Sequence, residues 1–242
     1  MAQWLAGADG CRTGWVAAFW HPRSGELRIR ILPRFADFAC VPEQPDVIAV
    51  DMPIGLPGHI GPEGRGPERM VRPLLGMRQS SVFSVPSRAA VYAPDFRKAC
   101  QVAMATSDPP RQLSKQLFMI APKIREVDGV LRADPQLAAR TFEVHPEVAF
   151  WRLNGDRALT EPKKVKGTPY PPGLTLRRRL LFAAGFAKTL LEAAPPRGAG
   201  PDDVLDALAC AAIARRIDVG LARPFPDPPG RDEHGLPIAI WA

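Results

Sequence analysis

The sequence predicts an α/β fold in which a mixed β-sheet carries helices on both faces. Three apolar runs near the N-terminus, at 4–10, 14–20 and 25–35, are separated by short turns, which is typical of an antiparallel meander. A fourth run, at 46–53, is apolar without alternation, as expected of a central strand covered on both faces. Helical patterns follow, and the clearest lies at 201–217. This order of elements predicts a meander extended by parallel strands.

The remaining elements follow from local signals. The run at 25–35 alternates apolar and charged residues, which favours a position nearer an edge of the sheet. We also expect a short helix at 36–44 and two further strands, at 140–144 and at 236–242. Longer helices are expected over 93–107, 109–133, 145–153, 174–186 and 201–217. Pro122 should perturb the second of these helices.

Length and charge bound the organisation and the partners. The 242 residues allow one large domain or two small ones, and we expect a single domain over 1–242. A basic stretch rich in Gly, Pro and Arg, followed by helices, forms an expected insertion at about 59–138. The net charge of +7 favours anionic partners such as nucleic acid, with simple solubility as the alternative. Homodimer formation stays open.

The cysteines and the N-terminal segment indicate the compartment. The four cysteines are scattered without a CxxC pair, which argues against a zinc site and a disulfide framework. The first ten residues lack the basic and apolar regions of a signal peptide, and no apolar run is long enough to cross a membrane. We therefore expect a soluble cytoplasmic protein with no membrane partner.

Carboxylates occur where secondary-structure propensity does not require them. Asp9 ends the first expected strand, and Asp51 ends the buried strand at 46–53. If these strands are parallel neighbours, the two acids meet at one edge of the sheet. Asp203 and Asp206, three residues apart, share one face of the 201–217 helix. A helix that crosses this edge would complete a cluster of three or four carboxylates.

Such a cluster requires compensation, because like charges a few Å apart repel strongly. Mg²⁺ or Mn²⁺, which prefer oxygen ligands, would supply it. Asp9, Asp51, Asp203 and Asp206 are therefore the expected metal ligands. Glu143, in or after the strand at 140–144, joins them as a candidate catalytic residue. Two such ions can activate a water and stabilise the leaving oxygen in phosphodiester cleavage.

Each acid also has a purely structural interpretation. Asp9-Gly10 is a common hairpin turn, and Asp51 could likewise be a turn residue before Pro53. Asp203 fits a helix's first turn, where it would serve capping and the macrodipole. Asp206 lies past any cap among apolar residues and is harder to explain in this way.

The motif after Glu143 has structural interpretations of its own. We expect His145 to cap the helix that follows. Glu147, in the first turn of that helix, is expected to be a surface acid favoured by the helix dipole.

Five ordered motifs resemble one known family over nearly the whole chain. They are "GADGCRTGWVAA", "VIAVDMPIGLP", "PKIREVD", "FEVHPEVAF" and "DDVLDALACAAIA". Together they resemble the family catalogued as domain of unknown function 429, regarded as predicted nucleases with an RNase H-like fold. The resemblance thus implies the ribonuclease H-type mixed sheet and a nuclease activity.

A more distant likeness connects the same motifs to Holliday-junction resolvases. On that resemblance Asp9 matches the first-strand aspartate, Asp51 the fourth-strand acid, and Asp203 with Asp206 the helix pair. Resolvases usually carry the longer Glu where this chain has Asp51. Glu143 has no clear resolvase counterpart and belongs to the motif of the narrower family.

Two basic stretches predict the contacts to substrate. Residues 59–99 hold seven Arg or Lys and residues 161–180 hold six, which together outweigh their acids by more than the whole net charge. Side chains among serines and glycines suit phosphate contacts, with a solvated surface as the alternative. The expected substrate-binding residues are Arg65, Arg69, Arg72, Arg78, Lys163 and Lys166.

These observations favour a divalent-metal-dependent nuclease that hydrolyses phosphodiester bonds of DNA or RNA. A phosphotransferase of the actin and sugar-kinase type shares the same core, but the chain is short for its paired domains. A catalytically silent nucleic-acid-binding protein is the third hypothesis. Metal titration separates the first hypothesis from the third, and ATP binding separates the second.

Overall fold

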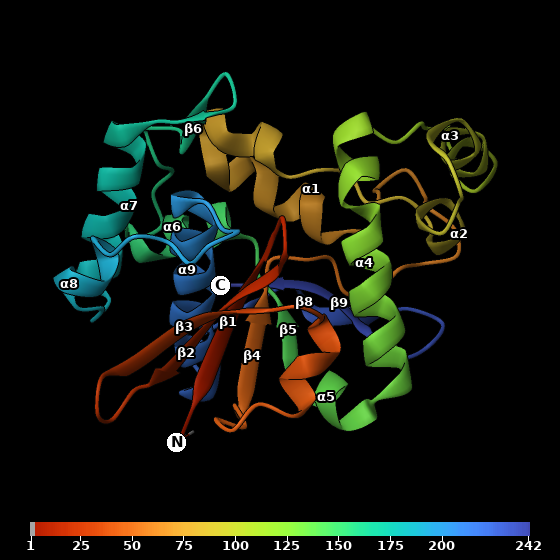
Figure 1. The fold of residues 1–242 in the computed structure, drawn as a ribbon. Helices are drawn as coiled ribbons and strands as arrows, with labels where there is room; N and C mark the ends of the chain where they lie inside the picture. The colour runs from red at the N-terminus through yellow and green to blue at the C-terminus, as the bar shows by residue number, and fades with distance from the viewer. Residues whose placement is uncertain (1–2) are drawn as a thin grey trace.

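A five-stranded mixed sheet forms the centre of the computed structural model, which describes residues 3–242. The strands follow the order β3-β2-β1-β4-β5 across the sheet (Figure 1). They are β1 (Leu5–Cys11), β2 (Gly14–His21), β3 (Glu26–Leu32), β4 (Val47–Val50) and β5 (Thr141–Glu143). The expected mixed sheet is confirmed.

The strand pairing confirms the meander and the parallel neighbours. β1 and β2 pair antiparallel, as do β2 and β3, and β3 lies at the edge that its alternating sequence predicted. β4 runs parallel to β1, with Ala8 opposite Val50, and parallel to β5, with Val50 opposite Glu143. The apolar strand β4 therefore lies inside the sheet, as expected.

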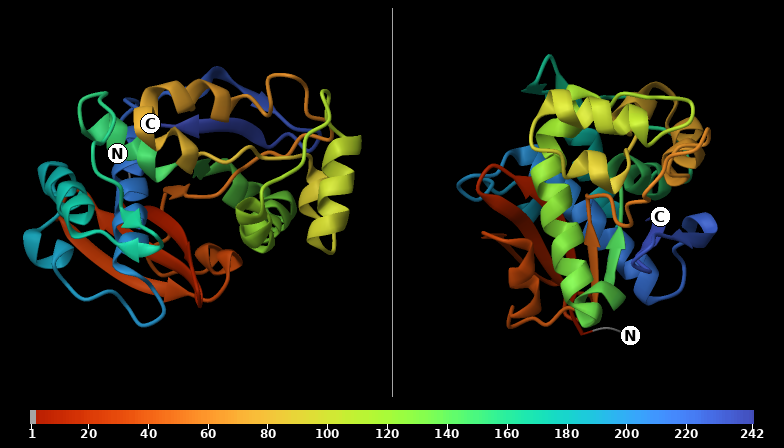
Figure 2. Two further views of the ribbon diagram at one scale, coloured as in Figure 1. Left: turned by 90° about the horizontal axis from the view of Figure 1, so that it is seen from above. Right: turned by 90° about the vertical axis from the view of Figure 1, so that its right-hand side faces the viewer.

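The two faces of the sheet carry separate apolar clusters, one against α9 (Pro201–Asp218) and one against α4 (Lys115–Ala133). Because side chains alternate along a strand, Leu5 of β1 faces α9, whereas Ala6 and Ala8 pack on the side of α4. Figures 1 and 2 show these two long helices on opposite sides of the strands. Helices thus cover both faces of the sheet.

Short helices fill the chain between β4 and β5. They are α1 (Pro67–Val71), the 3-10 helix η2 (Arg72–Ser81), α2 (Arg88–Val91), α3 (Phe96–Ala105) and α5 (Pro135–Ala139). The expected helices at 93–107 and 109–133 are confirmed as α3 and α4, and Pro122 lies inside α4 without ending it. The stretch at 59–92, which showed no clear periodicity, contains α1, η2 and α2.

The helices expected at 145–153, 174–186 and 201–217 are confirmed apart from their ends, whereas a short helix at 188–191 was not expected. The short helix expected at 36–44 is a 3-10 helix, η1 (Phe35–Ala39). The remaining helices are α6 (Pro146–Leu153), α7 (Pro171–Ala183), α8 (Lys188–Leu191) and α9 (Pro201–Asp218). Within residues 3–242, none of the helices combines the length and the apolar character that a membrane span requires.

Two hairpins complete the fold. β6 (Lys164–Val165) pairs with β7 (Thr168–Pro169), and β8 (Pro224–Arg231) pairs with β9 (Pro237–Trp241). The expected C-terminal strand is β9, but it pairs with β8 and does not join the central sheet. Figure 2 shows this hairpin beside the short helices of the 67–81 segment. Ile240 packs there with Val71 and Leu75.

Candidate metal centre

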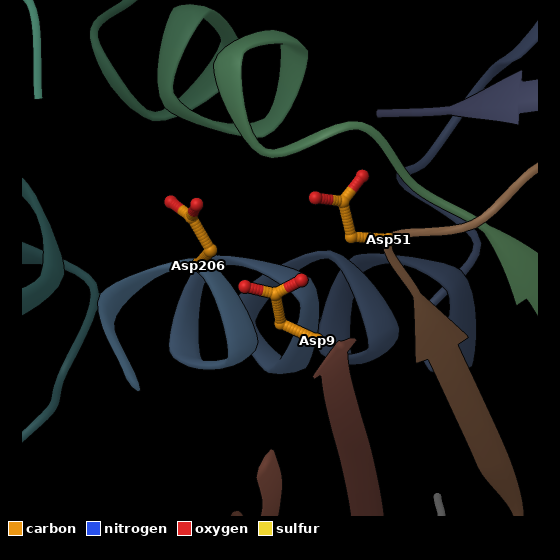
Figure 3. A group of neighbouring side chains, drawn as sticks. All are labelled: Asp9, Asp51 and Asp206. Atoms are coloured by element: carbon orange, nitrogen blue, oxygen red, sulfur yellow. The ribbon is translucent and has the colours of Figure 1, made fainter. Parts of the chain in front are cut away.

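Parallel pairing brings the first two aspartates together. The amide of Asp51 donates to the carbonyl of Ala8 at 2.9 Å, so Asp51 continues the ladder beside Asp9 (Figure 3). Asp9 lies inside β1 opposite Val16, and the strand runs on to Cys11. The interpretation of Asp9-Gly10 as a hairpin turn is therefore wrong, because the chain turns between Cys11 and Gly14.

Asp206 approaches from α9, and a glycine in β1 allows the close approach. A Cβ atom on Gly7 would lie only 1.9 Å from the carbonyl oxygen of Ala207 and 2.3 Å from the amide nitrogen of Ala211. The helix therefore packs backbone to backbone against β1, with Asp206 one residue before the contact. One carboxylate oxygen from each of Asp9, Asp51 and Asp206 lies within 4.8 Å of the other two.

Asp203 lies outside this group. Its Oδ2 accepts a hydrogen bond from the amide of Gly200 at 2.8 Å, so it caps the start of α9. Asp202 forms an ion pair with Lys164 at 2.6 Å. The structure therefore gives Asp203 the structural task that its helix position predicted, and it places only Asp206 of the pair among the three clustered carboxylates.

Burial and mutual repulsion act on the clustered acids. Burial, followed by the charges of Asp51 and Asp206, raises the pKa of Asp9 well above its usual value. The same two causes, burial and the charge of Asp206, raise the pKa of Asp51 to about 7. Asp206 is 1% exposed, and its Oδ1 has no hydrogen-bond partner among the described residues. The cluster is thus short of positive charge and of hydrogen-bond donors.

One lysine provides partial compensation. Lys163 forms an ion pair with Asp206, although it was expected to contact substrate phosphate. Burial alone would lower the pKa of Lys163, but the charges of Asp206, Asp9 and Asp51 raise it. Lys163 directly precedes the β6–β7 hairpin, and its side chain remains 33% exposed. Among the described residues, the ammonium of Lys163 therefore faces three carboxylates.

Glu143 belongs to a different cluster. Its carboxylate accepts from Arg65 Nη1 at 2.9 Å and Nη2 at 2.5 Å, and from the amide of Ile54 at 2.8 Å. Arg65 also pairs with Glu68 at 2.7 Å. The Arg65 side chain is fully buried by this cluster, so the structure places it in the interior and not at a phosphate-binding surface.

Two of the other candidate arginines, Arg69 and Arg72, also have partners within the protein. Arg69 pairs with Glu63 at 2.5 Å, and Arg72 donates to the carbonyl of Val82 at 2.9 Å. The Nε of Arg78 is buried without a partner among the described residues. Lys166 is exposed in the β6–β7 turn with a φ of 50°. Pairing within the protein therefore engages some of the basic residues that were expected to contact phosphate.

Glu147 was expected at the surface, and this expectation is wrong. It is 6% exposed and forms an ion pair with Arg177, which is itself fully buried. The first turn of α6 faces inward, because α7 covers it. His145 accepts a hydrogen bond from the amide of Glu147 at 3.2 Å, which confirms its role as a helix cap. The sequence around Glu147 did not indicate that the first turn of α6 would be buried.

A cavity of about 320 Å³ opens beside the clustered aspartates. Asp9, Asp51 and Lys163 line one part of it, and Glu143 and Glu147 line another. Apolar residues close the rest, mainly from the 82–85 segment and from α4. Two of the three clustered aspartates therefore share one cavity with Lys163, Glu143 and Glu147.

The chain belongs to the family described as a protein of unknown function (DUF429), because the model of that family matches residues 7–231. The matched range includes all three clustered aspartates, Glu143 and the lining of the cavity, apart from Ile240. No curated protein and no solved structure matches the chain.

Proposed function

We propose that the protein is a divalent-metal-dependent nuclease that hydrolyses phosphodiester bonds of DNA or RNA at the Asp9–Asp51–Asp206 centre. The observation that carries the proposal is the unpartnered Oδ1 of Asp206, buried beside two further carboxylates. A buried carboxylate oxygen without a donor is costly, and a cation would relieve that cost. We further propose that the meander, the parallel strands and the crossing helix form an RNase H-like fold.

The donor set fits Mg²⁺ or Mn²⁺. Three carboxylates supply hard oxygen ligands, whereas no cysteine or histidine belongs to the described acidic group. When bound, such an ion polarises the phosphoryl group and lowers the pKa of a coordinated water. Asp9, Asp51 and Asp206 would hold it, and the raised pKa values of Asp9 and Asp51 mean that binding releases protons.

The remaining residues would position the substrate. Lys163 lines the cavity and carries the positive charge nearest the three carboxylates, so a phosphate oxygen would find an ammonium donor there. Glu143 and Arg65 keep the chain after Asp51 in place through the hydrogen bond to Ile54. We assign Glu143 this positioning role and no direct part in the chemistry.

The test is a cleavage assay on single-stranded, duplex and branched DNA and RNA, with Mg²⁺ and with Mn²⁺. We expect metal-dependent cleavage that Asp206→Asn reduces by at least about 100-fold, since metal contacts supply several kcal/mol to the transition state. Asp203→Asn is the matched control, because it neutralises an acid of the same helix that serves as a cap. It should retain activity near that of the wild type.

The alternatives predict other outcomes. A catalytically silent binding protein would bind nucleic acid without cleaving it, and Mn²⁺ would not raise its melting temperature. A phosphotransferase would bind ATP. Equal loss of activity in Asp203→Asn and Asp206→Asn would trace the effect to the stability of α9 and would contradict the proposed centre.

A further inference from the structure

We infer that the cavity beside the aspartates binds one unpaired nucleobase, so that the substrate is a nucleotide outside a duplex. This inference rests on the proposed function, which supplies the phosphate group at the carboxylates. It adds the class of substrate, which the acidic centre alone does not define.

The size of the cavity is the first argument. Its volume of about 320 Å³ lies at the lower end of the range of about 300–1,000 Å³ found for small-molecule sites. A single base with its sugar suits such a space, whereas a duplex presents stacked pairs that cannot enter it. A base inside a duplex would first have to leave the stack.

The chemistry of the walls is the second argument. Val82, Phe83 and Val85 line one side, and Leu117 and Ile120 of α4 line another. An apolar wall with an aromatic ring suits the face of a base, because every base can stack on it and be buried there, whichever base it is. The wall adjoins Asp9 and Asp51, so one ligand can place its base on the wall and its phosphate at the acids.

A polar acceptor lies in the same space. Glu147 lines the cavity, and its Oε2 has no hydrogen-bond partner within residues 3–242. Its other oxygen accepts from Arg177. An N–H group on the edge of a base would give this oxygen a hydrogen-bond partner.

The distribution of arginines is the third argument. A protein that follows the backbone of a long duplex presents free cations along its surface. Here Arg65 is buried with Glu143, Arg69 pairs with Glu63, and Arg72 is bound to Val82. Three of the arginines expected to contact phosphate are therefore engaged within the protein, which favours recognition at the cavity.

Ile120 and Met119 provide a matched pair for the test. Ile120 lines the cavity and is partly buried, whereas the adjacent Met119 is 71% exposed and is not among the lining residues. Ile120→Trp would fill the cavity, and Met119→Trp adds the same side chain outside it. Both variants leave the three aspartates in place, so Mn²⁺ should raise both melting temperatures by the amount that we expect for the wild type.

The experiment measures binding of a single strand that carries 2-aminopurine, with Ca²⁺ as the cation, and cleavage of the same strand with Mn²⁺. We expect Ile120→Trp to lose at least tenfold in affinity and in kcat/KM, and Met119→Trp to match the wild type. The wild type should bind the annealed duplex, and an all-abasic strand of equal length, at least tenfold more weakly. Competition by a nucleoside monophosphate distinguishes free nucleotides from single strands as the natural source of the base.

Two results would overturn the inference. One is equal binding of the abasic strand or the duplex by the wild type, a comparison that needs no variant to fold. The other is an Ile120→Trp variant that behaves like Met119→Trp. A protein that binds the 2-aminopurine strand but cleaves nothing would contradict the nuclease and leave the base site supported, so the two failures are distinguishable.

Discussion

Two acidic clusters border the same cavity and differ in how their charge is balanced. In the first, Arg65 holds Glu143 and Glu68 in short contacts, and a backbone amide completes the set. In the second, Asp9, Asp51 and Asp206 face one ammonium, that of Lys163, beside a short, exposed hairpin. The first cluster is satisfied from within the protein, whereas the second is not.

The difference identifies the task of each cluster. A buried ion pair is tolerated when its hydrogen bonds are complete, and the protein then gains a fixed geometry. A cluster left short of positive charge stores unfavourable energy, which a bound cation releases. The cluster of Glu143 therefore supports the fold after β4, and we propose that the cluster of Asp206 is the one that binds a cation.

Removal of the arginine from the balanced cluster should give the largest change in stability. Arg65→Met leaves Glu143 and Glu68 buried without their cation, and we expect a loss of about 3–5 kcal/mol in the free energy of unfolding. Urea denaturation measures it. Arg69→Met, whose exposed pair with Glu63 is worth at most about 1 kcal/mol, is the control. Similar losses in both variants would show that the comparison between the clusters has no energetic basis.

In the cluster of Asp9, Asp51 and Asp206, removal of one charge should raise the stability of the fold and not lower it. At about pH 8, where the acids are more ionised, Asp206→Asn removes one of three facing carboxylates. We expect the melting temperature in metal-free buffer to rise by a few degrees, since about 1 kcal/mol corresponds to about 2–4 °C at this chain length. The rise caused by Mn²⁺ in the wild type should disappear. A lower melting temperature with an intact Mn²⁺ response would contradict this assignment of Asp206.

Local features of the sequence predicted the three aspartates of this site and the strands and helix that hold them. The unbroken apolar run of β4, the meander before it and the alanine-rich α9 were sufficient to place Asp9, Asp51 and Asp206 together. Gly7 is the physical reason that the placement succeeded, because a side chain there would hold α9 away from β1. Hydrophobic periodicity and the position of acids near strand ends therefore predicted most of the central sheet and the three clustered aspartates.

Partners distant in sequence were not predictable in the same way. Arg65 and Lys163 looked alike as basic residues near glycines, yet one completes a buried cluster and the other faces the aspartates. Glu147 points inward only because α7 brings Arg177 against it. Strand β8 was missed because its four prolines lack amide donors, which is typical of a loop or an edge strand. Long-range packing decided each of these cases.

The raised pKa of Asp51 should make the response to metal depend on pH. A carboxyl whose pKa is about 7 when folded and 3.8 otherwise stabilises the fold at low pH, and this contribution is lost as the pH rises through 7. Because metal binding requires the ionised form, the Mn²⁺-induced rise in melting temperature should grow between about pH 5.5 and about pH 8.5. Differential scanning fluorimetry measures it. A pH-independent Mn²⁺ shift in the wild type would exclude Asp51 as a ligand.

Lys163 should affect metal affinity and leave the fold in place, because it is the cation that pairs with Asp206. The ammonium of Lys163 already pairs with Asp206 and lies near the other two carboxylates. A bound cation must therefore share these carboxylates with it. We expect Lys163→Gln to tighten Mn²⁺ binding about tenfold, or about 1.4 kcal/mol, in calorimetric titration. Lys166→Gln, which removes an equal charge from the exposed turn three residues away, should leave the affinity unchanged. Equal tightening in both variants would mean that the overall positive charge of the hairpin repels the cation. Weaker binding in Lys163→Gln alone would mean that the lysine holds the carboxylates in the geometry the cation requires and does not compete with it.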